Sequence, residues 1–398
     1  MTKINEIIVV TLQKNIFKMK IAVDCRMLEM SGIGNYLENI LHYWLKRNDL
    51  SFLLIGNTKK IKKLSLSDNC EILHCETPIF SVKEFLCFPT KKINQCDVFF
   101  CPNYNIPSGI KIPIYLVIHD VVFWDVENLV SPIGKAIRRF FLKRAIHLSN
   151  KIFSVSEFSK NRIIYHFNCK AEKVIVGYNG INYELLKYQN ADLQPIFDFK
   201  YFIFVGNIKK HKGLDVLLSA YENIIDSSLS SFLQKQESPE IKEIAGQARN
   251  DNTTFNKPKL VIVGNFENFK TKDKKLIRIF QKQTENIIFT GKIDNFTLFS
   301  LIKNSVALIQ PSVYEGFGLP PLEALFLGTK VILSDIDVFK EIYSNLPVIF
   351  FQKSNVNDLQ IKMQQIDLED IKTSNCELNK KYSYENSADL ILSEILKQ

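Results

Sequence analysis

The sequence predicts an α/β protein of two domains, in which short buried strands alternate with helices. Its length of 398 residues suits two or three domains of ordinary size, and its 46% hydrophobic content can build full cores. Short apolar runs are repeatedly followed by a loop and an amphipathic segment, an alternation typical of parallel sheets. A polar, proline-bearing stretch, residues 183–198, separates two such series and predicts a linker.

Composition narrows the function classes. The formal charge of +9 favours an anionic partner, which is a nucleotide diphosphate, a nucleic acid or an acidic membrane surface. The basic residues are spread along the chain, which counts against a nucleic-acid groove. The eight cysteines show no CxxC spacing and lie mostly in apolar runs, so we expect reduced core residues in a cytoplasmic protein. No apolar segment is long enough to span a bilayer.

The α/β pattern begins at Met19, where the strand MKIAVD leads into a loop with Gly32 and Gly34 and then an amphipathic helix. We expect residues 1–18 to be an extension, because their apolar piece, IIVVTL, is too short for a signal peptide. The two glycines allow a ligand to approach the backbone at the carboxyl end of the strand, although a plain tight turn explains them equally well. The third glycine of a dinucleotide fingerprint is missing, which counts against NAD.

Another strand end carries polar side chains. The apolar runs VFFC and IYLVI predict buried parallel strands, and the second delivers His119 and Asp120 at its carboxyl end. This is the edge where α/β sheets place their chemistry. We expect Asp120 to orient the imidazole of His119, since a catalytic histidine usually needs such an acceptor. Further along, Ser156 is expected to cap a helix.

Residues 131–147, SPIGKAIRRFFLKRAIH, predict a basic helix with aromatic residues. The interpretation we favour is a cationic face exposed to solvent beside a core stripe. The alternative is attachment to anionic lipid headgroups, which would suit a membrane-anchored acceptor.

The second domain begins with the strand YFIFVG. The loop that follows it, residues 206–213, is cationic and precedes a helix, so it predicts an anion site. Residues 227–259 are polar and lack a sustained apolar period, and we expect a disordered insertion there. Beyond them, the strand in ENIIFTGKID ends at Gly291.

The stretch from Gln310 to Ser334, QPSVYEGFGLPPLEALFLGTKVILS, predicts a strand, a glycine loop, a helix that Gly328 ends, and a strand. The loop amides and the helix N-terminus form a receptor for phosphate. Two carboxylates flank that receptor, Glu315 in the loop and Glu323 in the first helical turn. Acids in this position suit a ligand that carries hydroxyl groups on both sides of its phosphates, and a nucleotide sugar is such a ligand.

The E-x7-E pattern, set in PSxYEGFGLPxLEA, resembles the hallmark of retaining glycosyltransferases of family 4. The segments DxRxLxxSGIGxY, HD and VSxFSK are similar to the same family, and the first leans toward its mannosyltransferase-like bacterial group. The resemblance covers Met19 to the C-terminus outside 227–259. It implies the α/β GT-B fold, with two Rossmann-like domains whose parallel sheets face each other across a cleft. These would be an acceptor-side domain at 19–190 and a donor-binding domain at 200–382, followed by a C-terminal helix at 383–398 that crosses back.

The resemblance also implies roles for individual residues. His119 would contact the transferred sugar and Glu315 would bind sugar hydroxyls, so these are the expected catalytic residues. Lys212 would clamp the donor diphosphate, and Glu323 would hold the ribose hydroxyls. The other expected donor-binding residues lie near the phosphates or the base and are Gly32, Gly34, Gly291, Gly316, Phe317, Gly318 and Leu319.

One departure from the family's pattern concerns the diphosphate. Many members carry an arginine near Asn207 as a second clamp, and this chain has none there. Lys209, Lys210 and His211 are the candidates to replace it.

The implied activity is transfer of a sugar, with mannose favoured, from a GDP- or UDP-linked donor to a cell-envelope glycan or glycolipid, with retention at the anomeric carbon. We expect no cofactor and no metal, because no Asp-x-Asp stands at a donor-loop position, and no nucleic acid. The expected location is the cytoplasm, with peripheral contact at the anionic inner face of the plasma membrane. Two alternatives stay open: a GT-B enzyme that needs no acceptor, such as a hydrolysing nucleotide-sugar epimerase, and a non-enzymatic two-domain sugar-binding protein.

Overall fold

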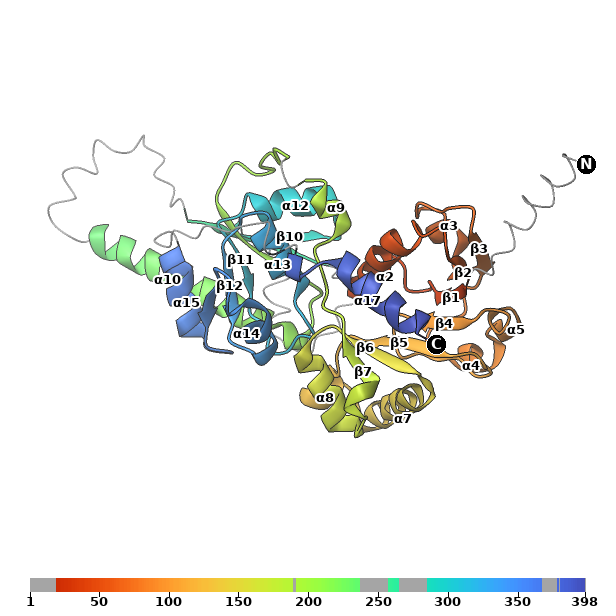
Figure 1. The fold of residues 1–398 in the computed structure, drawn as a ribbon. Coiled ribbons are helices and arrows are strands. Elements are labelled where there is room, and N and C mark those ends of the chain that lie inside the picture. The colour runs from red at the N-terminus through yellow and green to blue at the C-terminus, as the bar shows by residue number, and fades with distance from the viewer. Residues whose placement is uncertain are drawn as a thin grey trace, which may run out of the picture. The chain divides into compact units, whose positions relative to one another are not determined.

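The structure, a computed structural model, describes residues 19–188, 191–236, 257–264, 285–366, 378 and 380–397. The chain divides into two compact units (Figure 1). Unit 1 consists of Met1–Gly180 and Tyr382–Gln398, and unit 2 of Ile181–Lys381, so the chain passes between the units twice. The expected extension at 1–18 lies outside the described residues. Within the described ranges, no helix has both the length and the apolar character needed to cross a bilayer.

Unit 1 contains a parallel sheet of seven strands in the order β3-β2-β1-β4-β5-β6-β7. The strands are β1 (Lys20–Asp24), β2 (Ser51–Gly56), β3 (Cys70–His74), β4 (Val98–Cys101), β5 (Ile114–Ile118), β6 (Lys151–Ser154) and β7 (Val174–Val176). The helices are α2 (Ser31–Trp44), α3 (Thr58–Ile61), α4 (Val82–Cys87), α5 (Thr90–Ile93), α6 (Val122–Asp125), α7 (Pro132–Leu148), α8 (Glu157–Phe167) and α17 (Tyr384–Leu396), with a 3-10 turn at Ala171–Lys173.

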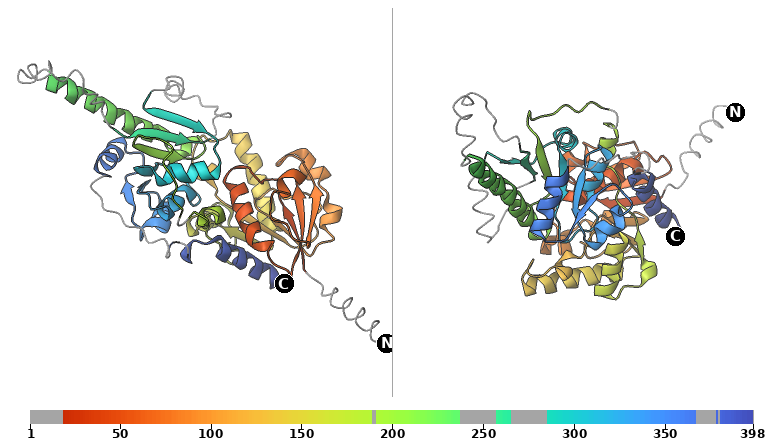
Figure 2. Two further views of the ribbon diagram at one scale, coloured as in Figure 1. Left: turned by 90° about the horizontal axis from the view of Figure 1, so that it is seen from above. Right: turned by 90° about the vertical axis from the view of Figure 1, so that its left-hand side faces the viewer.

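Helices cover both faces of this sheet, which is why its central strands are apolar at successive positions. One face packs against α5, α7 and α8 in a single core cluster that includes Phe99 and Leu142. Side chains alternate along a strand, so the neighbouring residues point to the other face. There the indole of Trp44 packs on Phe100, with ring centroids 4.8 Å apart, and donates to the carbonyl of Ala388 at 3.0 Å. Helix α17 therefore lies beside α2 (Figure 2).

Unit 2 contains a parallel sheet of six strands in the order β10-β9-β8-β11-β12-β13. The strands are β8 (Tyr201–Val205), β9 (Lys259–Val263), β10 (Ile287–Gly291), β11 (Ala307–Gln310), β12 (Val331–Ser334) and β13 (Ile349–Phe351). The helices are α9 (Tyr183–Leu186), α10 (Leu214–Gln236), α12 (Asn295–Lys303), α13 (Leu319–Phe326), α14 (Asp337–Tyr343) and α15 (Val356–Gln365), with a 3-10 turn, η2, at Lys210–Lys212.

The two sheets confirm the predicted α/β class with parallel strands. The prediction that Ser156 caps a helix is also confirmed, because its side chain accepts from the N–H of Ser159 at the start of α8. The expected disorder from residue 227 is wrong at its beginning, since α10 continues to Gln236. The ten residues from 227 to 236, SSLSSFLQKQ, contain no glycine or proline, so a helix that is already formed can extend through them. Residues 237–256 of the expected insertion lie outside the described residues.

Candidate functional site

The site in unit 2 is built at the carboxyl edge of its sheet. Strands β8 and β11 are neighbours and parallel, so the loops that follow them meet at one edge. The first loop ends with η2 and Gly213, and the second runs from Pro311 to Gly318. The N–H of Val313 in the second loop donates to the carbonyl of His211 in the first at 2.9 Å. Sheet topology therefore brings together two loops that are distant in sequence.

Gly213 is the point of closest approach between these loops. Its φ is +67°, and a Cβ added there would lie 1.9 Å from the carbonyl oxygen of Pro311. No side chain fits at that distance, and the left-handed conformation itself disfavours one. The glycine thus holds the neighbouring Lys212 against the second loop.

Lys212 and Glu315 form an ion pair between the two loops. The Nζ of Lys212 lies 2.7 Å from each carboxylate oxygen of Glu315. The side chains are 21% and 9% exposed, so the pair is only partly open to water. Both residues were expected at the site from the sequence, and the structure brings them into direct contact.

Two further residues hold Glu315, and the sequence analysis did not identify them. The hydroxyl of Ser312 donates to Oε1 of Glu315 at 2.8 Å, and the side-chain amide of Gln310 lies 3.0 Å from that hydroxyl. Both are buried, with 0% and 1% of their surface exposed. The available signal was their place at the end of an apolar strand, because buried polar side chains need partners.

The glycine loop leads directly into α13. Gly318 has φ +94°, and a Cβ there would lie 2.5 Å from Cε1 of Phe339. Its carbonyl accepts a hydrogen bond from the hydroxyl of Tyr343. No side chain caps α13, which begins at Leu319, and Phe317 is buried just before it. The loop from Gly316 to Leu319 therefore presents mainly backbone at the N-terminus of the helix.

Glu323 differs from its expected position. Because α13 begins at Leu319, Glu323 lies in the second turn of the helix rather than the first. The helix begins at Leu319, one residue before the proline predicted to open it, so Glu323 lies one position further from its N-terminus. Glu323 is 6% exposed, and burial raises the pKa of its carboxyl to about 7. This carboxyl therefore changes charge close to neutral pH.

Three other positions in unit 2 that were expected at the donor site are accessible to a ligand. Gly291 ends β10 with φ +72°, and a Cβ there would meet no atom within 4 Å. Lys209 and Lys210, two candidates to replace the missing arginine, are exposed on the first loop. The third candidate, His211, is half-buried and contributes its carbonyl to the contact with Val313.

In unit 1 the two expected glycines lie in the first turn of α2 rather than in a loop. A Cβ on Gly34 would lie 2.4 Å from the carbonyl oxygen of Met27, so this glycine lets the helix pack on the preceding turn of its own chain. At Gly32 an added Cβ would meet nothing within 4 Å. Gly32 is therefore the position of the two that leaves room for a ligand.

His119 lies at the carboxyl end of β5 and is held by backbone. Its Nε2 is 2.9 Å from the carbonyl oxygen of Pro102, which can only accept, so Nε2 carries the proton. Burial lowers the pKa of His119 to about 4, against the smaller effect of that carbonyl. The ring is therefore neutral at pH 7. Its edge-on neighbour is Tyr36, with centroids 4.9 Å apart.

The expectation that Asp120 orients His119 is wrong. Oδ1 of Asp120 accepts from the N–H of Val122 at 3.0 Å and so begins α6, while Pro102 orients the imidazole. A carboxylate beside a strand end often turns back to the next free N–H groups of its own chain. The Asp120 carboxylate is thus used for local backbone capping.

The predicted site residues form two groups, one at the carboxyl edge of each sheet. Lys212, Glu315, Glu323 and the glycine loop belong to unit 2, and His119 belongs to unit 1 with Gly32 and Gly34. In the described part of the chain, no three His, Cys, Asp or Glu side chains gather as metal ligands would.

Known proteins resemble this chain in sequence. Residues 192–384 match the family of glycosyl transferases group 1. The chain is 25% identical over 231 residues to the O-antigen chain mannosyltransferase RfbU of Salmonella typhimurium, covering 58% of this chain and 54% of that protein. It is 21% identical over 265 residues to the O-antigen chain mannosyltransferase B of Escherichia coli, covering 63% and 60%. The matched part thus spans little more than half of each relative.

Solved structures resemble the whole chain. HepE of Anabaena, determined in complex with UDP and glucose, has a TM-score of 0.66 at 15% identity and covers 96% of this chain and 100% of its own. A glycosyltransferase of Rickettsia africae has a TM-score of 0.60 at 18% identity, with 96% and 97% covered. At this identity the likeness establishes the fold. Residues 192–384 therefore match the glycosyl transferases group 1 family, and the chain has the GT-B fold.

Proposed function

We propose that this protein is a retaining glycosyltransferase. It would move a sugar, with mannose favoured, from a nucleotide diphosphate sugar to a glycan or lipid-linked acceptor of the cell envelope. The observation that carries the proposal is the buried Lys212–Glu315 ion pair, set beside a glycine loop in a unit that matches the glycosyl transferases group 1. The relatives named as O-antigen chain mannosyltransferases support the sugar and the acceptor class. A structure of HepE with UDP-glucose supports a nucleotide sugar as donor.

In the proposed mechanism, Lys212 binds the donor diphosphate. The diphosphate competes with Glu315 for the ammonium group of Lys212, so donor binding loosens the ion pair. Backbone amides from Gly316 to Leu319 directly follow Glu315 in the chain and lead into the N-terminus of α13. These positive ends would stabilise the charge that grows on the leaving diphosphate, which is usually the largest contribution to such catalysis.

Glu315 then faces the sugar. Its carboxylate stays in place because Ser312 and Gln310 hold it from the side of the sheet. It would accept hydrogen bonds from sugar hydroxyls and stabilise the positive charge at the anomeric carbon of an oxocarbenium-like transition state. Glu323 would hold the ribose hydroxyls in the same donor.

The reaction balances without an enzyme base. The bond between the anomeric carbon and the diphosphate oxygen breaks, and a bond to the acceptor oxygen forms on the same face. The acceptor hydroxyl's proton passes to the leaving phosphate oxygen. His119 is neutral at pH 7 and has its Nε2 proton engaged with Pro102, so its Nδ1 would accept a hydrogen bond from a sugar hydroxyl.

A thermal-shift screen with GDP-, UDP-, ADP- and dTDP-sugars tests the donor class. A ligand present at 100 times its Kd stabilises the folded state by about 2.7 kcal/mol, so the correct nucleotide should raise Tm clearly. The product made with an acceptor extract from the cell envelope would then be analysed by NMR for anomeric configuration. Sugar released equally well without any acceptor would instead support a hydrolysing enzyme, and no stabilisation by any nucleotide sugar would refute the proposal.

Glu315→Ala tests the site itself. We expect transfer to be abolished while the variant remains folded, as judged by circular dichroism. Near-normal turnover in this variant would remove Glu315 from the mechanism.

A further inference from the structure

An exposed apolar patch lies on α4 and α7 of unit 1. On α7 the side chains of Ile133, Ile137 and Phe140 are 75%, 53% and 61% exposed, and on α4 those of Val82 and Leu86 are 75% and 71% exposed. We call these five residues the α4–α7 surface. Single exposed apolar residues are common on proteins, but a contiguous group of this kind usually marks an interaction site.

The pattern along α7 is the reverse of an ordinary surface helix. Ile133, Ile137 and Phe140 follow the spacing that places residues on one side of a helix. The opposite side carries Leu142 and Ala145, which are fully buried in the core of unit 1. A solvent-exposed stripe on such a helix should be polar. The solvated cationic face favoured from the sequence does not explain an outer stripe that is apolar.

The two helices form one continuous surface. The ring of Phe80, which precedes α4, lies 6.5 Å from that of Phe141 on α7. The guanidinium of Arg144 on α7 lies over the ring of Phe85 on α4, 5.2 Å from its centroid. Helices α4 and α7 are therefore neighbours on the surface of unit 1.

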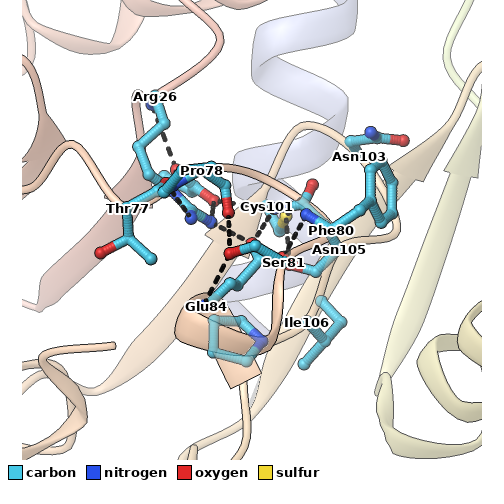
Figure 3. A network of polar contacts seen from close by, with 12 residues as sticks. Arg26, Thr77, Pro78, Phe80, Ser81, Glu84, Cys101, Asn103, Asn105 and Ile106 are labelled. Carbon is cyan, nitrogen blue, oxygen red and sulfur yellow. Dashed lines mark hydrogen bonds and ion pairs between the residues drawn. The ribbon is translucent and has the colours of Figure 1, made fainter. Parts of the chain in front are cut away.

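A buried polar network fixes α4 in this orientation (Figure 3). Glu84, on the inner side of α4, accepts from Arg26 at 2.5 Å and from Asn105 at 2.8 Å. Its other oxygen accepts from the N–H of Phe80 at 2.6 Å. Arg26 also pairs with Asp24 at the end of β1. With Glu84 anchored inward, Val82 and Leu86 on the same short helix are held outward.

The charge on both helices has a single sign. Between Pro132 and Leu148 there is no acidic residue, and the only acid of α4 is the buried Glu84. The basic residues on the two helices are Lys83, Lys135, Arg138, Arg139, Lys143 and Arg144. Apolar side chains that protrude among cations match the chemistry of a negatively charged bilayer surface. The lipid tails surround the apolar side chains, and the anionic headgroups attract the cations.

We propose that the α4–α7 surface docks on an anionic lipid bilayer. The apolar side chains enter the interfacial region, and the exposed Lys83 and Lys143 contact the headgroups. The occupant is a bilayer and not a folded partner, because the apolar residues protrude from two convex helices and every exposed charge on those helices is positive. This inference concerns unit 1 alone and does not rest on the proposed transfer reaction.

Flotation of the full chain with vesicles tests the proposal. We expect binding to vesicles of phosphatidylglycerol mixed with phosphatidylcholine and none to phosphatidylcholine alone. The double variant Ile137→Glu/Phe140→Glu should lower vesicle affinity at least about tenfold, because its apolar area no longer enters the bilayer. Lys83→Gln/Lys143→Gln should lower it about 25-fold, at about fivefold for each cation. The matched control Ile361→Glu changes a 48% exposed apolar residue on α15 and should leave binding unchanged.

Each contrary result overturns the proposal. One such result is that the native chain does not bind anionic vesicles. The other is that the α4–α7 variants bind as well as the native chain while their circular dichroism melts show that they are folded. A dimer of the native chain in analytical ultracentrifugation that the same variants abolish would assign the surface to a second copy instead. Nucleotide sugars should raise the Tm of all these variants by the same amount. A failure of the membrane proposal can therefore be distinguished from a failure of the transfer proposal.

Discussion

Glu323→Gln is expected to remove a pH-dependent cost from the folded state. Burial raises the pKa of this carboxyl from 4.5 to about 7. Each tenfold change in proton affinity corresponds to about 1.4 kcal/mol, so ionised Glu323 costs the folded chain about 3 kcal/mol. Glutamine has the same shape and no charge, so the variant should escape that cost.

The sign follows from proton uptake. Below pH 4.5 the carboxyl is protonated in both states and contributes nothing. Between 4.5 and about 7 the folded state binds more protons than the unfolded state, so the native protein loses stability as pH rises. Above about 7 the loss is complete. The variant's advantage should therefore grow from near zero at pH 4.5 to about 3 kcal/mol at about pH 8.

Urea unfolding of both proteins across this range measures the difference. The matched control Glu285→Gln alters an exposed carboxyl in the same unit and measures the effect of this substitution without burial. A constant difference between native protein and Glu323→Gln at all pH values would refute the assigned pKa. In the same titration, donor affinity of the native protein should rise with pH up to about 7, since ribose hydroxyls donate to the ionised form.

Three further substitutions probe the scaffold of the two units. Ser312→Ala should lower kcat about tenfold or more in a transfer assay, because a hydrogen bond to a charged group such as Glu315 contributes about 1.5–3 kcal/mol. Arg26→Met should destabilise unit 1 by about 3–5 kcal/mol in urea unfolding, because it leaves buried carboxylates without their cation. Gly213→Ala should abolish donor stabilisation in thermal shift and cost more than about 2 kcal/mol, because a Cβ collides with Pro311.

Controls for these variants come from the chain itself. Arg47→Met breaks an exposed ion pair with Asp49 and should cost less than about 1 kcal/mol, so an equal cost at Arg26 would contradict the argument from burial. Gly291→Ala also forces a left-handed residue, but into open space, and should cost only about 1–2 kcal/mol. Unchanged kcat in Ser312→Ala would show that Glu315 needs no support from the sheet side.

Local patterns in the sequence predicted the fold well. Apolar runs such as YFIFV became fully buried strands because strands covered on both faces select apolar residues at every position. Ser156 caps α8 through a contact three residues away, which the sequence contains directly. The start of α2 was misplaced because glycines suggest a loop, whereas Gly34 serves the packing of a helix on the turn before it.

The site could be predicted only in part. Lys212 and Glu315 were expected from their motifs, but their ion pair joins loops 103 residues apart and depends on β8 lying beside β11. The roles of Ser312 and Asp120 depend on which hydrogen-bond partners the folded chain offers. The sequence contains the donors and acceptors, and tertiary packing decides between them.

The position of α17 has a consequence for how the protein is made. Trp44 is completely buried, and part of its cover is Ala388 on α17, which the ribosome delivers only after all of unit 2. At about 5–20 residues per second, the 204 positions between Gly180 and Tyr384 take roughly 10–40 s to synthesise. During that interval the side chain of Trp44 lacks its cover from α17, while unit 2 can already fold. Unit 1 is thus translated first but completes its fold last. A chaperone that binds nascent chains should therefore contact the segment around Trp44.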